Sequence, residues 1–458
     1  MNRSLFLLLL ALAQPLHAAG LNDPFGELDD APAPPCRQPA EKAALALLDV
    51  VDLALCHNPQ TREVWANARV QAAQAGVARA AYLPTLDGKL VAARKRPDNG
   101  ATYRQNDATL TFGYLLYDFG ARSAALENAR QLLAAAGATQ DATVQAVFLS
   151  AVQAYYQAQT AEAALAAARE SERASRESLK AAEVRYRVGS GTPADRLQAQ
   201  TAWSQAVLNR IAAEGSLKGA QGALANVIGR DAHRGVPLAP MADAAPAEGF
   251  ERDVEALVAE ARRRRPDLRA AESQVKAAQA NTDAARAAGR PTLSFAATAG
   301  NQGIEGSAYQ HSGSLGVTLN IPLFSGFATT YKVRAAEAQA DARAAQRDRV
   351  SLQVALDVWN ANHGLATATQ SLRSAADLLA SALQSEGVAL GRYRAGVGSI
   401  LDVLNAQSAL AAARQQKVQA AYNWNVARAA LAQAMGSLDF DFLQSPPHDT
   451  PLSEKVAP

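Results

Sequence analysis

Residues 185–200 read RYRVGSGTPADRLQAQ, and residues 392–407 read RYRAGVGSILDVLNAQ. The two segments share an Arg-Tyr-Arg motif, a glycine after it, and an aspartate and a glutamine further on, all 207 positions apart (392 − 185). The same offset relates other landmarks of the chain, namely Pro59 with Pro266, Pro84 with Pro291, and Gly229 with Gly436. A register that holds along most of the chain indicates an internal duplication. Gly120 and Gly326 are 206 positions apart, which predicts a one-residue adjustment inside each repeat.

Both repeats show the same order of predicted elements: a helix, two strands, a very long helix, a turn and a returning helix. The first helix is expected to begin near Asp49 and to end before Pro84, and its partner to end before Pro291. Proline disfavours helical conformation in the residue that precedes it, so a helix end before each of these two prolines is expected.

The long helices are the most distinctive expectation. Residues 121–187 contain no proline, and residues 327–394 are their counterpart. A continuous helix of about 67 residues reaches about 100 Å at 1.5 Å per residue. Helices of this length are typical of coiled coils and helical tubes rather than of single globular domains.

Four short segments alternate apolar and polar residues, as strands with one apolar face do. The apolar sets are Leu86, Gly88, Leu90 and Ala92; Leu110, Phe112, Tyr114 and Leu116; Leu293, Phe295 and Ala297; and Leu315, Val317, Leu319, Ile321 and Leu323. This pattern is typical of barrel strands in lipid. A soluble antiparallel hairpin with one buried face has the same alternation, so the pattern alone leaves both open.

The N-terminus predicts export. Arg3 precedes an apolar run over residues 5–12, and small residues follow at 16–19, as in a secretory signal peptide. In an oxidising compartment, Cys36 and Cys56 are expected to form a disulfide; the alternative is two buried free thiols. Neither cysteine directly follows the apolar run, so no lipid anchor is expected.

These observations divide the chain into six segments. We expect a signal peptide at 1–18, an N-terminal segment at 19–48, repeats at 49–230 and 251–436, a linker at 231–250 and a C-terminal tail at 437–458.

The sequence offers no enzyme chemistry. It contains neither a nucleotide-binding phosphate loop nor a GxSxG nucleophile motif. The six histidines are too scattered to pair as metal ligands at helical spacing. A net charge of +2 gives no indication of nucleic-acid binding. We therefore expect a protein that is not an enzyme, with no cofactor and no metal.

The ordered set of features resembles the TolC-like outer-membrane factor family along nearly the whole mature chain. The resemblance implies a mainly α fold with membrane β structure: a homotrimer with four strands per protomer in a 12-stranded outer-membrane β-barrel, continuous with a long periplasmic α-helical barrel. It also implies a periplasmic adaptor protein, an ATP-driven or proton-driven inner-membrane transporter and outer-membrane lipid as partners.

The resemblance further implies a periplasmic gate at the two turns. Its residues would be Asp402, Asn405, Asp195 and Tyr393, and the tip turns that meet the adaptor would include Gly189, Gly191, Gly396 and Gly398. Gly398 stands where the family has an arginine in the closed-state network, so that network must differ here. Both aspartates also sit where a carboxylate simply stabilises a helix start.

Three functions remain open. The first is the exit duct of a type I protein-secretion system, as in the ducts for adenylate cyclase-haemolysin, which the chain also resembles. The second is the outer-membrane channel of a multidrug or metal efflux pump. The third is a periplasmic coiled-coil scaffold with no pore.

Overall fold

A computed structural model describes residues 23–29, 44–96, 98, 100, 102–233, 235–239 and 253–439. The expected signal peptide, Cys36, and most of the expected linker and tail lie outside these residues. The chain divides into two units, which we describe separately. The sheet unit includes Trp65–Thr139 and Arg269–Arg349, and the helical unit includes Gln140–Leu268 and the described residues from Val350 onward.

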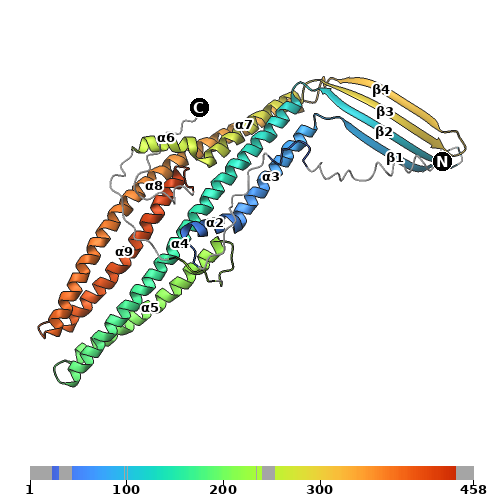
Figure 1. Cartoon of the computed structure of the whole chain (residues 1–458). Helices are drawn as coiled ribbons and strands as arrows, with labels where there is room; N and C mark the ends of the chain where they lie inside the picture. Colours follow the sequence, from blue (N-terminus) through green and yellow to red (C-terminus); the bar gives the residue numbers. More distant parts are fainter. Residues whose placement is uncertain are drawn as a thin grey trace. The chain divides into compact units, whose positions relative to one another are not determined.

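The described elements follow one another in the expected order, with eight helices and four strands (Figure 1). The first repeat contains α2 (Leu47–His57), α3 (Pro59–Ala80), β1 (Thr85–Lys95), β2 (Tyr103–Tyr117), α4 (Ala121–Arg187) and α5 (Pro193–Val227). The second contains α6 (Val254–Arg264), α7 (Pro266–Ala287), β3 (Thr292–Ile304), β4 (Gln310–Asn320), α8 (Ala328–Arg394) and α9 (Ile400–Ala434).

The duplication holds in the structure, helix by helix. Each helix of the first repeat has the same length as its counterpart: 11, 22, 67 and 35 residues. Each pair of helices also starts 207 residues apart, as α4 at Ala121 and α8 at Ala328 do. The sequence therefore predicted the two repeats and their long helices correctly.

The expected one-residue adjustment inside each repeat was wrong, as the residues before the two long helices show. The residue pairs that precede α4 and α8 are Phe119-Gly120 and Gly326-Phe327, and all four have positive φ. The two repeats thus use the same left-handed pair with phenylalanine and glycine in exchanged order, and the 207 offset is unbroken. Because Phe327 is left-handed, α8 begins at Ala328 rather than at residue 327.

The first helix of each repeat was expected to be continuous, and this expectation was wrong. Asn58 separates α2 from α3, and Arg265 separates α6 from α7. Both residues are extended, with ψ of 129° and 120°, and both precede a proline. The proline ring disfavours the helical conformation in the residue before it, and the helix breaks there.

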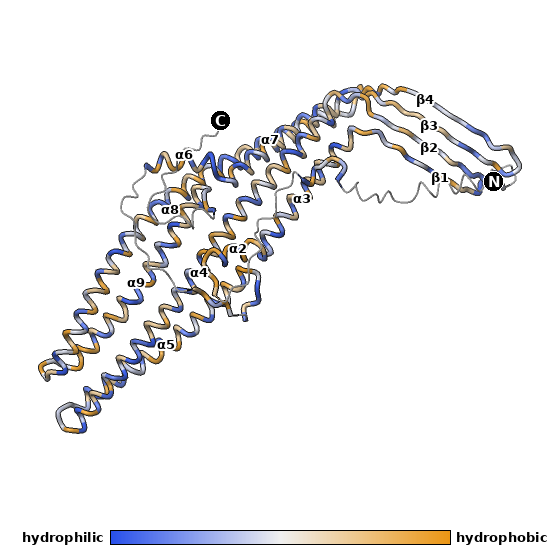
Figure 2. Tube along the Cα trace, viewed as in Figure 1, coloured by the Kyte–Doolittle hydropathy of each residue, from blue (hydrophilic) through white to orange (hydrophobic). Residues whose placement is uncertain are grey.

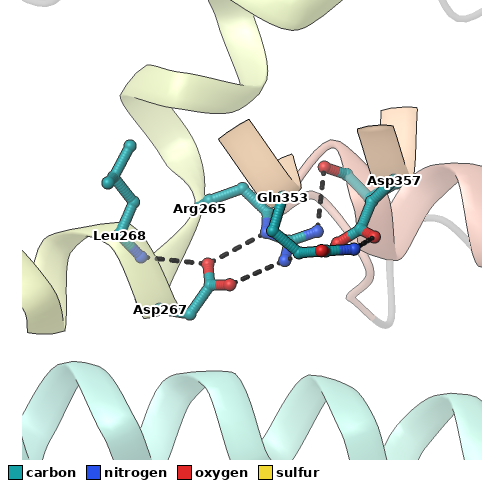
Figure 3. Close-up of polar contacts among 6 residues, drawn as sticks. Arg265, Asp267, Leu268, Gln353 and Asp357 are labelled. Carbon is teal, nitrogen blue, oxygen red and sulfur yellow. Dashed lines mark hydrogen bonds and ion pairs between the residues drawn. The ribbon is translucent and has the colours of Figure 1, made fainter. Parts of the chain in front are cut away.

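Arg265 fixes the joint between α6 and α7 (Figure 3). Its guanidinium donates to Asp267 at 2.9 and 2.6 Å and to Asp357 of α8 at 3.1 Å. Gln353 donates to the same Asp357 at 2.7 Å. Burial alone would raise the pKa of Asp267, but the hydrogen bonds and charge of Arg265 outweigh burial and lower it.

The sheet is antiparallel, in the order β1-β2-β3-β4. Its register places Leu86 opposite Phe112, Ala297 and Leu315 in turn, while Asp87 lies opposite Thr111, Thr298 and Ser314. One face is therefore apolar and the other polar, and Figure 2 shows the two kinds of residue following one another along the strands. On the apolar face Leu315 is 76% exposed, so the described part of the chain does not bury it.

A β-bulge refines the expected faces. The pairing of β2 with β3 shifts between Leu115 and Tyr117, which places Tyr117 opposite Leu293. Leu116 is thereby left out of the ladder, although strict alternation assigns it to the apolar face. Within the described strands, β1 and β4 each pair on one side only.

The helical unit has one large buried cluster for each repeat. The first repeat's cluster joins α2, α4 and α5, with Phe148 at its centre, and includes Ala429 and Ala432 of α9. The second joins α6, α7, α8 and α9 around Val354 and Val358. Among the described residues, no helix is both long enough and apolar enough to span a membrane.

Candidate functional site

Two tight turns join the paired helices of the helical unit. Gly189 follows α4 with φ +75°, and Gly396 follows α8 with φ +80°, a conformation that residues with a Cβ rarely adopt. Gly191 and Gly398 are confined for another reason. A Cβ there would lie 3.1 and 3.0 Å from the Cβ atoms of the preceding arginines. A side chain would therefore strain the backbone at Gly189 and Gly396 and crowd the neighbouring turn at Gly191 and Gly398.

The returning helices begin with matching caps. Thr192 accepts the Asp195 backbone N–H at 3.1 Å, and the Asp195 carboxylate accepts the Thr192 N–H at 2.9 Å. Ser399 and Asp402 exchange the same two bonds at 3.1 and 3.2 Å. Each reciprocal pair satisfies two backbone donors that the helix start would otherwise leave without partners. Both aspartates thus stabilise the start of a helix, whatever further role they have.

Asp402 and Asn405 are exposed, three residues apart in the first turns of α9. Residues at this spacing share one face of a helix, so their side chains can line a common surface. Asp195 is half-buried on α5, and within the described residues its carboxylate bonds to Thr192 rather than to Tyr393.

Tyr393 is buried, with 7% of its surface exposed, where the two helix pairs meet. The Arg185 guanidinium of α4 lies 4.0 Å from the Tyr393 ring centroid and also donates to the Tyr393 carbonyl oxygen at 2.6 Å. Around this pair, a small apolar cluster includes Ala182, Ala199 and Ile400. A positive charge over an aromatic face, joined to a charged hydrogen bond, holds the α4–α5 hairpin against the α8–α9 hairpin.

Sequence reasoning missed two polar links that join the hairpins near their turns. Arg185 is one partner, and the other link is a 3.2 Å hydrogen bond from Ser178 of α4 to Gln407 of α9. Arg185 and Gln407 both belong to the repeated motifs, but a motif does not show which residue its side chain will meet.

Among the described residues, no group of His, Cys, Asp and Glu is placed to hold a metal ion. Cys56 is half-buried near the end of α2. Because Cys36 lies outside the described residues, the disulfide stays a prediction.

Comparison with known proteins identifies the class. The outer membrane efflux protein family matches residues 50–230 and 257–437, one match for each repeat. The chain is 35% identical to "Protein CyaE" of Bordetella pertussis over 347 residues, which is 74% of this chain and 73% of that protein. It is 28% identical to the "Toluene efflux pump outer membrane protein TtgF" of Pseudomonas putida over 291 residues, 60% of this chain and 59% of that protein.

Solved structures agree on the fold. The outer-membrane channel OprN superposes with a TM-score of 0.76 at 22% identity, covering 89% of this chain and 95% of that one. The Campylobacter jejuni CmeC outer membrane channel gives 0.77 at 18% identity, covering 86% of each chain. The fold and the matches thus define a passive outer-membrane channel of tripartite export systems. This chain belongs to the outer membrane efflux protein family, so the expected TolC-like fold and the expectation that it is not an enzyme are confirmed.

Proposed function

We propose that this chain forms, as a homotrimer, the exit duct of a type I protein-secretion system. The observation that supports a trimeric duct is the sheet, which has an apolar face with exposed side chains and, within the described residues, no partner strand for β1 or β4 on its outer edge. An unpaired strand edge in lipid costs several kcal/mol for each unsatisfied backbone group. If β4 of each copy pairs with β1 of the next, three copies close a barrel of 12 strands (3 × 4) with no free edge.

The two faces of the sheet support this assembly. Lipid would cover the apolar face with Leu86, Phe112 and Leu315, and water would fill the lumen along the face with Asp87 and Thr298. A soluble hairpin would need another part of the chain to cover the apolar face, and the described residues supply none. A coiled-coil scaffold without a pore gives no reason for a sheet with an exposed apolar face.

The turns would form the gate at the periplasmic end. Asp402, with Asn405 on the same helix face, would place a ring of carboxylates in the pore of the trimer. Asp195 and Tyr393 would act in the closed state, with Arg185 supplying the link that Gly398 cannot. The glycine turns at 189–191 and 396–398 would meet the periplasmic adaptor, which couples the duct to an inner-membrane transporter. Residues 1–18 would direct export and be removed.

Protein secretion is favoured over drug or metal efflux by the comparisons together with the sequence. Identity to "Protein CyaE" is 35% over 74% of the chain, against 28% over 60% for the two efflux-pump proteins. The resemblance to ducts for adenylate cyclase-haemolysin points in the same direction. Efflux of small molecules is the second candidate, because the family includes channels of both kinds.

Deleting the gene in the bacterium that carries it separates the two candidates. We expect one or a few large proteins to disappear from the culture medium, while minimal inhibitory concentrations of antibiotics, solvents and metals stay unchanged. Mass spectrometry of the medium measures the first effect, and restoring the intact gene is the control. An unchanged set of secreted proteins with lowered inhibitory concentrations would instead establish the efflux function.

A further inference from the structure

Two arginines lie opposite each other at one end of the sheet's apolar face. In the register of β1 with β2, Arg94 is the partner of Arg104, four residues beyond the pair of Leu90 with Ala108. Both arginines are exposed, and because side chains alternate along a strand they lie on the same face as Leu90. The Cβ atoms of directly opposed residues are about 4.5–5.5 Å apart, and like charges in such a pair repel each other.

No acidic side chain neutralises this pair within the described part of the chain. Glu305 follows β3 beside Arg104, and its carboxylate accepts the Arg104 backbone N–H at 3.1 Å. Neither the Arg94 nor the Arg104 guanidinium has a hydrogen bond or an ion pair to a described residue. β4, which would neighbour β1 in the proposed trimer, contains no acidic residue. The pair therefore presents two positive charges that an anion from outside the chain can bind.

The second repeat lacks this pair of charges at the same place in the sheet. The counterparts of Arg94 and Arg104, 207 residues later, are Asn301 and His311, which also lie opposite each other. Strand pairing therefore does not require arginine at these positions. Arg96 adds a third exposed cation just after β1, and its counterpart in the second repeat is a glycine. The basic cluster is thus a property of the first repeat alone.

The pair lies at the level of the membrane surface if the sheet crosses the outer membrane. On the same face of β2, Tyr114 is ten residues from Arg104 (114 − 104), which is about 34 Å along a strand. At a strand tilt of about 40° this covers about 26 Å across the membrane, and the apolar band of such barrels is about 25 Å tall. A Cβ on Gly303 would lie 2.5 Å from the Tyr309 ring, so this ring lies near the same end, as aromatic residues at the headgroup level do.

The connections of the strands give the direction. The helices α3, α4, α7 and α8 all join the sheet at the end away from the two arginines. In the proposed duct the helices are periplasmic, so the arginines would face the outer leaflet. The anionic groups at that surface are the phosphates of lipid A, the phosphorylated glycolipid of the outer leaflet.

We propose that Arg94 and Arg104, with Arg96 beside them, bind a phosphate group of lipid A. A phosphate between the two guanidinium groups offsets their repulsion and accepts bidentate hydrogen bonds from them. Each copy has one such site, and lipid that binds only the folded sheet stabilises it by mass action. The proposal rests on the duct proposed above, since a sheet outside a membrane meets no lipid A.

Native mass spectrometry of the purified trimer in detergent tests the site by counting the lipid A molecules that bind as lipid A is added. Arg94→Gln with Arg104→Gln should weaken binding at least tenfold. The matched control is Lys89→Gln with Lys95→Gln, which removes two charges from the opposite face of β1 and should leave the affinity within twofold of the parent. Arg94→Glu is a second variant, because its carboxylate can pair with Arg104 across the strands. It should keep the trimer and lose lipid A binding.

Several outcomes would overturn the site. These are equal binding by the parent and the double arginine variant, an equal loss in the double lysine variant, and equal binding of lipid A whose phosphates have been removed. An equal affinity for phosphatidylglycerol would assign the site to phospholipid, and an equal affinity for inorganic phosphate, measured by calorimetry, to the free ion. A parent protein that is a trimer by light scattering and binds no lipid A overturns the lipid site alone, whereas a monomeric parent overturns the proposed duct.

Discussion

Removing the Arg185 side chain should loosen the contact between the two helical hairpins. In Arg185→Ala the guanidinium that lies 4.0 Å from the Tyr393 ring and donates to its carbonyl is lost. A partly desolvated cation–π contact contributes about 1–2 kcal/mol. A hydrogen bond from a charged donor contributes about 1.5–3 kcal/mol. The two terms share one side chain and do not add fully, so we expect a loss of about 3 kcal/mol for each copy.

A loss of this size changes the ratio of joined to separated hairpins about 100-fold. If the turns form the gate, the variant should conduct more current in planar bilayers and should sensitise cells to antibiotics too large for ordinary porins. Arg187→Ala is the matched control, because Arg187 is an exposed arginine two residues further along α4. Equal conductance in the Arg185 variant and the parent protein would refute the idea that this contact holds the gate. An equal rise in both variants would show that general charge loss, and not the contact, is responsible.

Three further outcomes are expected. Asp402→Ala should raise the channel conductance and weaken its preference for cations, whereas Ser399→Ala, which removes only the cap bond, should change neither. Equal effects of the two substitutions would show that Asp402 acts only as a helix cap. Cys36 and Cys56 should give a gel-mobility shift on reduction, and labelling of both thiols in the unreduced protein would exclude the bridge. Because its pKa is lowered, Asp267 stabilises the fold above the ordinary aspartate pKa of about 3.9, and this contribution fades as the pH falls through the folded value. Asp267→Asn should therefore lower the melting temperature at neutral pH more than at pH 3, and a constant difference would contradict this.

Some helix limits followed from the sequence because they depend on local backbone chemistry. The proline-free run after Gly120 predicted α4 to its observed ends because Gly189 terminates it. The break at Asn58 was equally local, since Pro59 follows it, yet the sequence analysis took only the later prolines, Pro84 and Pro291, as helix ends. The strand faces were also readable, apart from the bulge at Leu116, which depends on pairing between strands rather than on either sequence alone.

The contacts between the repeats could not be predicted in the same way. Arg185 and Tyr393 lie 208 residues apart, and their meeting depends on how two separate hairpins pack. For Asp195 and Asp402, one role could be predicted from the sequence and the other could not. Their cap bonds follow from a Ser or Thr three residues earlier, which the sequence contains, whereas a position in a pore depends on an assembly of several chains.

Comparison of the two repeats separates side chains that both copies of the fold need from side chains that depend on the surroundings of one copy. At the helix joints, Asn58 donates to the Val227 carbonyl at 3.0 Å and Arg265 to the Ala434 carbonyl at 3.5 Å, so both joints hold the end of the returning helix. Only Arg265 extends further, to Asp357 on α8. A position that is buried in one copy and exposed in the other has different surroundings in the two copies. Val152 of α4 retains 1% of its surface, whereas Trp359, its counterpart 207 residues later in α8, retains 53%. Within the described residues, this position of α8 therefore lacks the cover that the same position of α4 has.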